Sequence, residues 1–251
     1  NDSIDGGAGA DTLLGNTGND TILGAAGDDS INGGTGNDSM VGGAGNDYYI
    51  VDSTLDAAVE SATSGTDSVL AQVSGFTLGS EVEWLILDGT YAVGGGGATA
   101  NTLVGNARAD TLSGGAGNDS LVGGAGNDYY IVDATADLVI EASAEGTDSV
   151  LANVTGYTLG AEAEWLVLGT GIAAGTGNAS ANTLVGNSIA NTLSGAAGAD
   201  SIAGGDGADS LHGGADADTL LGEGGNDTLV GDTGTDSLVG GAGNDSLGGD
   251  A

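Results

Sequence analysis

A large apolar residue recurs at every ninth position over the first fifty residues, and small or polar residues fill the positions between. The recurring apolar residues are Ile4, Leu13, Ile22, Ile31, Met40 and Tyr49. Each stands in the middle of three residues that favour a short β-strand, with its side chain on one face. A nine-residue unit with one such strand cannot bury an apolar face alone, so it must stack on copies of itself. Two consecutive units then make one coil of turn, strand, turn and strand.

Gly33–Ile50 contains two consecutive copies of the unit, GGTGNDSMV and GGAGNDYYI. Glycines at the first, second and fourth places favour a tight turn whose carbonyl groups point inward. An acid at the sixth place, Asp38 and then Asp47, adds a carboxylate to these carbonyls. Oxygen-only, anionic ligands suit Ca²⁺ far better than zinc or copper. The turns therefore predict calcium sites, arranged in two rows because every second unit shares an edge of the stack.

Regular units fall into three blocks, and two segments with few glycines separate them. The blocks are residues 1–50, 105–131 and 186–251, and the segments between them are 51–104 and 132–185. The second irregular segment repeats the first without insertion or deletion, from the shared YYIVD at its start to the shared ANTLVGN at its end. We predict one continuous β-roll over residues 1–251, with about 14 coils of 18 residues.

The phase of the repeat favours continuity through the first irregular segment. Gly42 and Gly105 are seven whole units apart, and Asp67 is displaced by two places, which predicts one longer and one shorter turn. We expect these coils to lack most ion sites and to rely on larger apolar side chains. The expected core residues are Val69, Phe76, Leu78, Leu85 and Leu87. A separate small domain or a loop, with a helix near Leu55–Glu60, is the alternative.

Composition narrows the classes of partner. The 251 residues include 53 Gly but no Pro or Cys, and 36 acidic residues against one basic residue give a net charge of −35. Such self-repulsion opposes a compact fold unless cations are taken up. No basic patch can meet phosphates, which excludes nucleic acid and anionic membrane surfaces as partners, and no apolar run is long enough to span a membrane. Because Asn1 falls in the middle of a unit, we expect a piece of a longer repeat protein.

The units GGTGNDSMV, GGAGNDYYI, GGAGNDSLV and GGAGNDSLG resemble the RTX nonapeptide of calcium-binding, haemolysin-type repeat proteins. The irregular segments resemble the longer inter-repeat segments of large secreted members of that family. The resemblance implies an all-β, right-handed parallel β-roll, a β-solenoid with Ca²⁺ between stacked turns. It also implies type I secretion from a Gram-negative bacterium, with folding on calcium outside the cell.

Carried over unit by unit, the resemblance makes the sixth-place carboxylates and the glycine-turn carbonyls the metal ligands. The implied carboxylate ligands are Asp2, Asp11, Asp20, Asp29, Asp38, Asp47, Asp110, Asp119, Asp128, Asp200, Asp209, Asp218, Asp227, Asp236 and Asp245. The implied glycine ligands are Gly9, Gly18, Gly27, Gly36, Gly45, Gly117, Gly126, Gly198, Gly207, Gly234 and Gly243.

Three turns depart from the family pattern. Arg108 replaces a glycine in one turn, and Ile189 and Asn191 replace a glycine and the acid in another, so we expect both turns to bind weakly or not at all. Asp216 replaces a glycine in a third turn, but Asp tolerates the left-handed conformation, so that site is expected to survive.

The regularity of the repeat favours a structural role. We expect a calcium-rigidified spacer in a secreted surface-layer, filament or adhesin protein, which self-associates or meets other cell-surface components. A catalytic role is not expected, since the chain has no HExxH or GxSxG motif and no Cys nucleophile, and His212 is its only imidazole.

A polysaccharide-binding module attached to a secreted enzyme is the alternative function. Aromatic side chains at outward places could stack on sugars. The candidates are Trp84, Trp165, Tyr91 and Tyr157.

Overall fold

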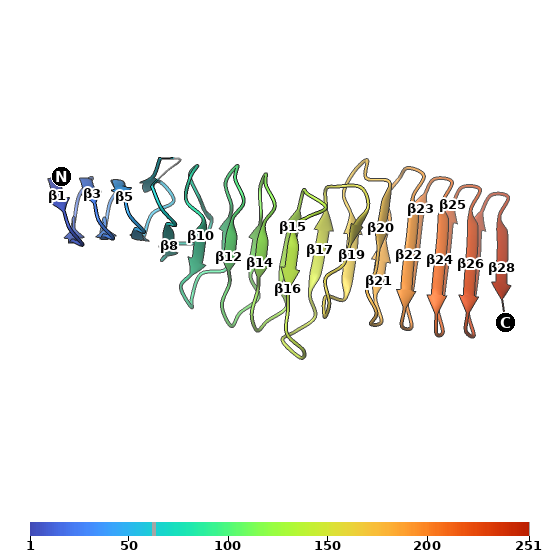
Figure 1. Ribbon diagram of the computed structural model, residues 1–251. Helices are drawn as coiled ribbons and strands as arrows, with labels where there is room; N and C mark the ends of the chain where they lie inside the picture. Colours follow the sequence, from blue (N-terminus) through green and yellow to red (C-terminus); the bar gives the residue numbers. More distant parts are fainter. Residues whose placement is uncertain (62–63, 251) are drawn as a thin grey trace. The chain divides into compact units, whose positions relative to one another are not determined.

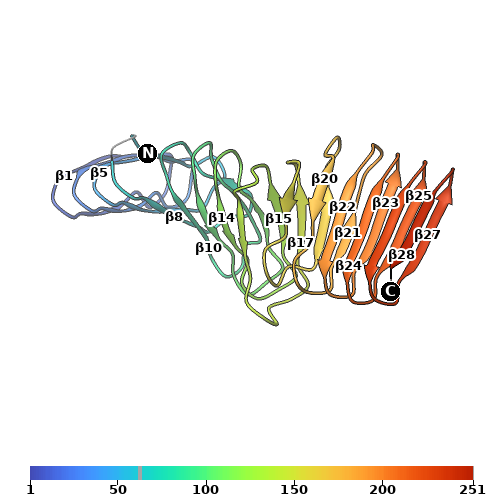
Figure 2. The same ribbon diagram turned by 45° about the vertical axis from the view of Figure 1, so that its right-hand side comes forward.

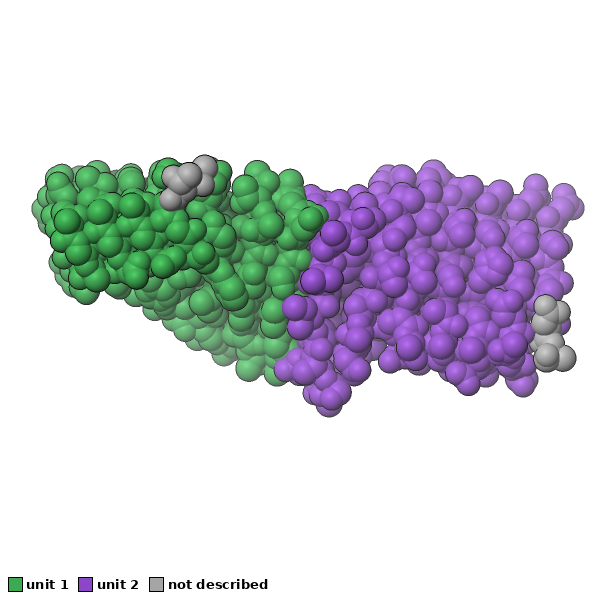
Figure 3. Space-filling model, in the orientation of Figure 1, with its two compact units in different colours: residues 1–128 green, residues 129–251 purple. Residues whose placement is uncertain are grey.

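The computed structural model describes residues 1–61 and 64–250, and it divides the chain into two compact units, residues 1–128 and 129–251 (Figure 3). The fold is an all-β parallel β-solenoid of about 14 turns, as the repeat predicts. No helix occurs in the described residues, and so none that could cross a membrane. Whether the roll is one continuous domain over 1–251 stays a prediction.

Unit 1 contains the first fourteen strands (Figure 1). They are β1 (Ser3–Ala8), β2 (Thr12–Leu14), β3 (Thr21–Ala26), β4 (Ser30–Asn32), β5 (Ser39–Ala44), β6 (Tyr48–Val51), β7 (Ala57–Val59), β8 (Ser68–Ala71), β9 (Phe76–Thr77), β10 (Trp84–Leu87), β11 (Val93–Gly95), β12 (Thr102–Val104), β13 (Thr111–Ser113) and β14 (Ser120–Val122).

Unit 2 contains the remaining strands, seen from a second side in Figure 2. They are β15 (Tyr129–Val132), β16 (Leu138–Ile140), β17 (Ser149–Ala152), β18 (Tyr157–Thr158), β19 (Trp165–Leu168), β20 (Ala174–Thr176), β21 (Thr183–Val185), β22 (Thr192–Ala197), β23 (Ser201–Asp206), β24 (Ser210–Ala215), β25 (Thr219–Gly224), β26 (Thr228–Thr233), β27 (Ser237–Ala242) and β28 (Ser246–Asp250).

Alternate strands pair in parallel, so each sheet contains one strand from each of the successive coils that it joins. In unit 1 the sheet order β1-β3-β5-β7 faces the even-numbered strands β2 to β14, and β9-β11-β13 continues the first face. The register places equivalent residues of successive coils side by side, for example Ile4 beside Ile22 and Ile22 beside Met40. In these columns the side chains of Ile22, Ile31, Met40 and Tyr49 are fully buried, and they form the core of the coil stack.

The first irregular segment continues the same stack. Strand β7 pairs with β5 and β8 pairs with β6, and no helix forms between Leu55 and Glu60. The expected larger core side chains are all buried: Val69, Phe76, Leu78, Leu85 and Leu87. Residues 62 and 63 of this segment lie outside the described residues.

A longer turn precedes Asp67 and a shorter turn follows it, as the displacement of Asp67 in the sequence predicts. The hydrogen bond that links Asp47 to Asp67 spans 20 positions of the chain, and the bond that links Asp67 to Glu83 spans 16. The equivalent bond in a regular coil, from Asp20 to Asp38, spans 18. The two deviations cancel, so the coils after Glu83 return to the phase of the coils before Asp47.

Unit 2 repeats this arrangement. Its odd-numbered strands β15 to β27 form one sheet face and its even-numbered strands β18 to β28 form the other. Ser149 pairs with Tyr129 of the coil before and with Trp165 of the coil after, which reproduces the long and short turns of unit 1. From β22 onward the strands are mostly six residues long, because the parallel pairing extends into the turns.

Candidate metal centres

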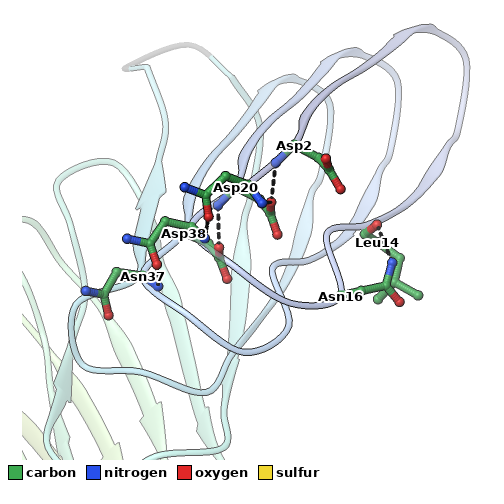
Figure 4. A network of polar contacts seen from close by, with 8 residues as sticks. Asp2, Leu14, Asn16, Asp20, Asn37 and Asp38 are labelled. Atoms are coloured by element: carbon green, nitrogen blue, oxygen red, sulfur yellow. Dashed lines mark hydrogen bonds and ion pairs between the residues drawn. The ribbon is translucent and has the colours of Figure 1, made fainter.

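The sixth-place acids stack into two ladders in the regular blocks. The backbone N–H of Asp20 donates to Oδ1 of Asp38, in the next coil, at 2.8 Å, and Asp2 donates in the same way to Asp20 (Figure 4). On the opposite edge, Asp11 donates to Asp29 at 2.8 Å. In unit 2 the same bond joins Asp200 to Asp218, Asp218 to Asp236, Asp209 to Asp227 and Asp227 to Asp245. One oxygen of each carboxylate is therefore used to hold the preceding coil.

The second oxygen of these carboxylates is buried without a hydrogen-bond partner. This holds for Oδ2 of Asp11, Asp20, Asp29, Asp38, Asp47, Asp200, Asp209, Asp218 and Asp227. An ionised oxygen buried in this way costs free energy unless a positive charge compensates it. The chain holds one Lys or Arg in total, so protein cations cannot supply that charge along two ladders.

Each orphaned oxygen points at the first glycine of its own turn. A Cβ added at Gly6 would lie 2.8 Å from Oδ2 of Asp11 and 3.0 Å from the carbonyl oxygen of Gly24 in the next coil. An equivalent pair of oxygens lies close to Gly15, the first glycine of the next turn, where an added Cβ would meet Oδ2 of Asp20 and the carbonyl oxygen of Gly33. A carboxylate oxygen and a carbonyl oxygen thus converge where only a glycine leaves room. This all-oxygen donor set fits Ca²⁺, which takes six to eight oxygen ligands.

The fourth-place glycines also allow the turns to stack closely, and their role as ligands, which the family resemblance implies, stays a prediction. Every one of the implied glycine ligands has a positive φ, for example +145° at Gly36 and +140° at Gly45. A Cβ at Gly36 would collide with the carbonyl oxygen of Gly18, one coil earlier. These glycines allow close stacking of the turns, and their carbonyls face the next coil. The first-place glycines, which lie beside the orphaned oxygens, and Gly225 at a fourth place were not among the implied ligands, although the GGxGxD pattern contains them.

Asparagine amides close some turns without a cation. Nδ2 of Asn187 donates to the carbonyls of Gly169 and Ile172, each at 2.7 Å, and Nδ2 of Asn178 donates to Gly160 and Ala163 at 2.7 and 2.8 Å. Both amides reach carbonyl oxygens of the preceding coil. In each turn the backbone N–H of the same Asn also donates to the sixth-place side chain, Asn191 and Asn182 respectively.

The Arg108 turn is closed in a related way. Nδ2 of Asn106 donates to the carbonyl of Tyr91, and its backbone N–H donates to Oδ2 of Asp110 at 2.6 Å, so this carboxylate has no orphaned oxygen. Weak calcium binding at this turn and at the Ile189 turn stays a prediction, for which these hydrogen bonds supply a physical reason. Asp216 has a φ of 77°, the left-handed conformation that the pattern requires there.

Burial raises the pKa of several ladder carboxyl groups, and it raises the pKa of Asp200 to about 6. Burial is also the main cause of the raised pKa of Asp38, Asp47, Asp209 and Asp218. Neighbouring ladder carboxylates push these pKa values further up, and the backbone N–H that each accepts pulls them back in part. A cation that occupies the turn would favour the ionised form instead.

The candidate sugar-stacking aromatics divide into two groups. Trp84 and Trp165 are 39% and 41% exposed on β10 and β19, and Tyr91 is half-buried. Tyr157 is only 2% exposed, so its prediction as an outward residue is wrong. Its ring belongs to the core because it begins the two-residue strand β18, equivalent to Phe76 in β9.

Ladders of buried carboxylates, glycine carbonyls from the next coil and parallel stacked turns together define a calcium-binding β-roll. The model of the RTX calcium-binding nonapeptide repeat matches residues 1–22, 14–49, 95–130, 176–211, 185–220 and 221–251. These matches cover more than half of the chain, and the chain belongs to this family. No curated protein matches the chain at a significant level.

Proposed function

We propose that this calcium-binding β-roll is a structural region of a secreted cell-surface protein, a spacer in a surface layer, filament or adhesin. The observation that carries the proposal is the row of orphaned carboxylate oxygens that recurs in successive turns, from Asp11 to Asp47 and again from Asp200 to Asp227. A site that recurs in successive coils stiffens the coil stack, whereas a binding or catalytic role needs one distinctive place. The proposal includes no catalytic step.

Calcium concentration would then decide where the chain folds. Each site that binds only the folded coil adds RT ln(1 + [Ca²⁺]/Kd), about 2.7 kcal/mol when calcium is a hundredfold above Kd. Several sites together outweigh the backbone entropy lost by a glycine-rich ribbon. Inside a cell, where calcium is scarce, the chain stays unfolded and passes a type I secretion channel; outside, it folds.

Antibodies raised against the folded chain test this proposal on intact cells of the source organism. We expect surface labelling that is lost after washing with EDTA and is restored by calcium. Electron microscopy of the purified chain in calcium is the second measurement, with end-to-end or side-to-side assemblies as the expected result. Antigen confined to the cell interior, together with a chain that stays monomeric in calcium, would overturn the proposal.

The exposed tryptophans favour a second candidate, a polysaccharide-binding module. An indole ring that is about two-fifths exposed offers a flat apolar face to a sugar. A glycan array probed with the wild-type chain and with Trp84→Ala and Trp165→Ala tests this candidate. Binding that both substitutions weaken would favour it over the spacer, and an array without hits would dispose of it.

A further inference from the structure

Three carboxylates meet where the first regular block ends. One oxygen each of Asp47, Glu60 and Asp67 lies within 4.8 Å of the other two. Asp47 closes the last regular turn of the block, whereas Glu60 and Asp67 come from the irregular segment that the sequence pattern predicts to lack most ion sites. All three residues belong to unit 1.

Glu60 takes the place of a glycine carbonyl in this turn. In the coil before, the first glycine, Gly24, faces Oδ2 of Asp29 and the carbonyl oxygen of Gly42. At Gly42 the equivalent neighbours are Oδ2 of Asp47 and Oε1 of Glu60, which stands in the coil that follows. A charged oxygen thus replaces the neutral one that completes the pair in regular turns.

An orphaned oxygen points into this cluster. Asp47 is 1% exposed, its Oδ1 accepts the backbone N–H of Asp29 at 2.8 Å, and its Oδ2 has no hydrogen-bond partner. That free oxygen faces Gly42 from the same side as Glu60. A buried anionic oxygen beside a second carboxylate is unfavourable unless a cation lies between them.

Neighbouring groups hold the other two carboxylates in position. The hydroxyl of Tyr49 donates to Oε1 of Glu60, and the backbone N–H of Gly43 donates to Oε2 of Glu60 at 3.3 Å. Oδ1 of Asp67 accepts the backbone N–H of Asp47 at 2.7 Å, and the hydroxyl of Ser64 donates to Oδ2 of Asp67 at 3.3 Å. Hydrogen bonds within the two adjacent coils therefore fix the orientation of these carboxylates.

We propose that Asp47, Glu60 and Asp67 form a three-carboxylate Ca²⁺ site that binds more tightly than the regular turns and fills first. Affinity for calcium rises with the number of charged ligands in a site. The expansion of the turn brings Asp67 into the ladder at a spacing of 20 from Asp47, instead of the 18 that separates Asp29 from Asp47. This inference depends on cation binding by the roll and not on any role at the cell surface.

Calcium titration of the full chain by calorimetry tests the site, with terbium emission excited through tyrosine as a second readout. We expect Glu60→Gln, which keeps the shape and the hydrogen-bonding capacity of the side chain, to weaken one tight site about tenfold or more. The sequence repeats the same acid types at Asp128, Glu141 and Asp148. We therefore expect the substitution to weaken one tight site and to leave the rest of the tight class unchanged. Tyr49→Phe should lower terbium emission from this class without changing the number of ions bound.

Glu223→Gln is the matched control, since it removes one charge from an exposed glutamate in a regular turn. We expect it to leave the tight class unchanged. Circular dichroism in saturating calcium establishes that Glu60→Gln is folded, and Asp67→Asn provides a second variant if it is not. Unchanged affinity and stoichiometry in the folded variants would overturn the proposal, because a protonated, purely structural Glu60 is mimicked by Gln.

Discussion

The backbone N–H of Asp20 donates to Oδ1 of Asp38 at 2.8 Å, while Oδ2 of Asp38 is buried with no hydrogen-bond partner. The two oxygens of one side chain thus have separate tasks. The first fixes the spacing of successive coils, and the second is available to a cation. Because the same division recurs along both ladders, coil stacking and ion binding are coupled.

Calcium removal should unfold the chain. The net charge of −35 and the orphaned oxygens oppose the ion-free coil stack, and each occupied site adds about 2.7 kcal/mol at a hundredfold excess of calcium over Kd. We expect far-ultraviolet circular dichroism to show coil in EDTA and β-structure after millimolar calcium is restored. Magnesium at the same concentration is the control, since it prefers a smaller octahedral shell with retained water. A spectrum that chelation leaves unchanged would contradict the prediction.

The first glycine of a regular turn should tolerate no side chain. In Gly33→Ala the new methyl group would collide with Oδ2 of Asp38, although the backbone conformation itself suits alanine. We expect a loss of about 1–3 kcal/mol in the free energy of unfolding and the loss of one bound calcium. Urea denaturation and calcium titration measure the two effects.

Gly89→Ala serves as the matched control for Gly33→Ala. Gly89 has no atom within 4 Å of an added Cβ and no positive φ, so the substitution should change neither stability nor calcium stoichiometry. Equal effects of the two substitutions would mean that the loss of a glycine causes the destabilisation, and not the collision of the added methyl group with Oδ2 of Asp38.

The amide-closed turns should depend less on calcium than the carboxylate turns. Asn187→Asp keeps the shape of the side chain but removes the N–H groups that reach the carbonyls of Gly169 and Ile172. Two carbonyls lose their donors, and because Gly169 is buried this costs about 1–3 kcal/mol. We expect this loss in low calcium and a partial recovery in high calcium, because the new carboxylate lies beside carbonyl oxygens that a cation can share. A loss of the same size at all calcium concentrations would contradict this account.

Acid should stabilise the ion-free fold. Burial raises the pKa of Asp200 to about 6, above the value of an unfolded Asp, so the folded state binds the proton more tightly. The resulting stabilisation is complete below the unfolded pKa and is lost as pH rises through about 6. In EDTA, where we expect coil at neutral pH, circular dichroism should therefore show more β-structure at pH 5 than at pH 7.5, and a smaller difference in Asp200→Asn. In saturating calcium the order of the two pH values should reverse, because protons and Ca²⁺ compete for the carboxylates.

Much of the site was predictable from the sequence because the repeat is local. The spacing from Gly33 to Asp38 puts a turn and its carboxylate in one unit, and the apolar slot at Met40 gives the strand that follows. Even the displacement of Asp67 was visible as a break in phase, and it appeared in the structure as one longer and one shorter step between coils. The prediction of Tyr157 as an outward residue overlooked the internal repeat, since Tyr157 occupies the place of the expected core residue Phe76.

The sequence by itself determined the period of nine, the parallel coil of two units, the buried apolar columns and the need for hard cations, because each follows from residues within one or two units. Only the tertiary structure decided which oxygen of each carboxylate is left open, which turns an asparagine amide closes, and that Glu60 replaces a glycine carbonyl beside Asp47. These features involve atoms from adjacent coils, whose meeting depends on the length of every turn between them. A pattern along the chain gives the type of residue at each place, whereas a cation site is decided by which oxygens of two coils face each other.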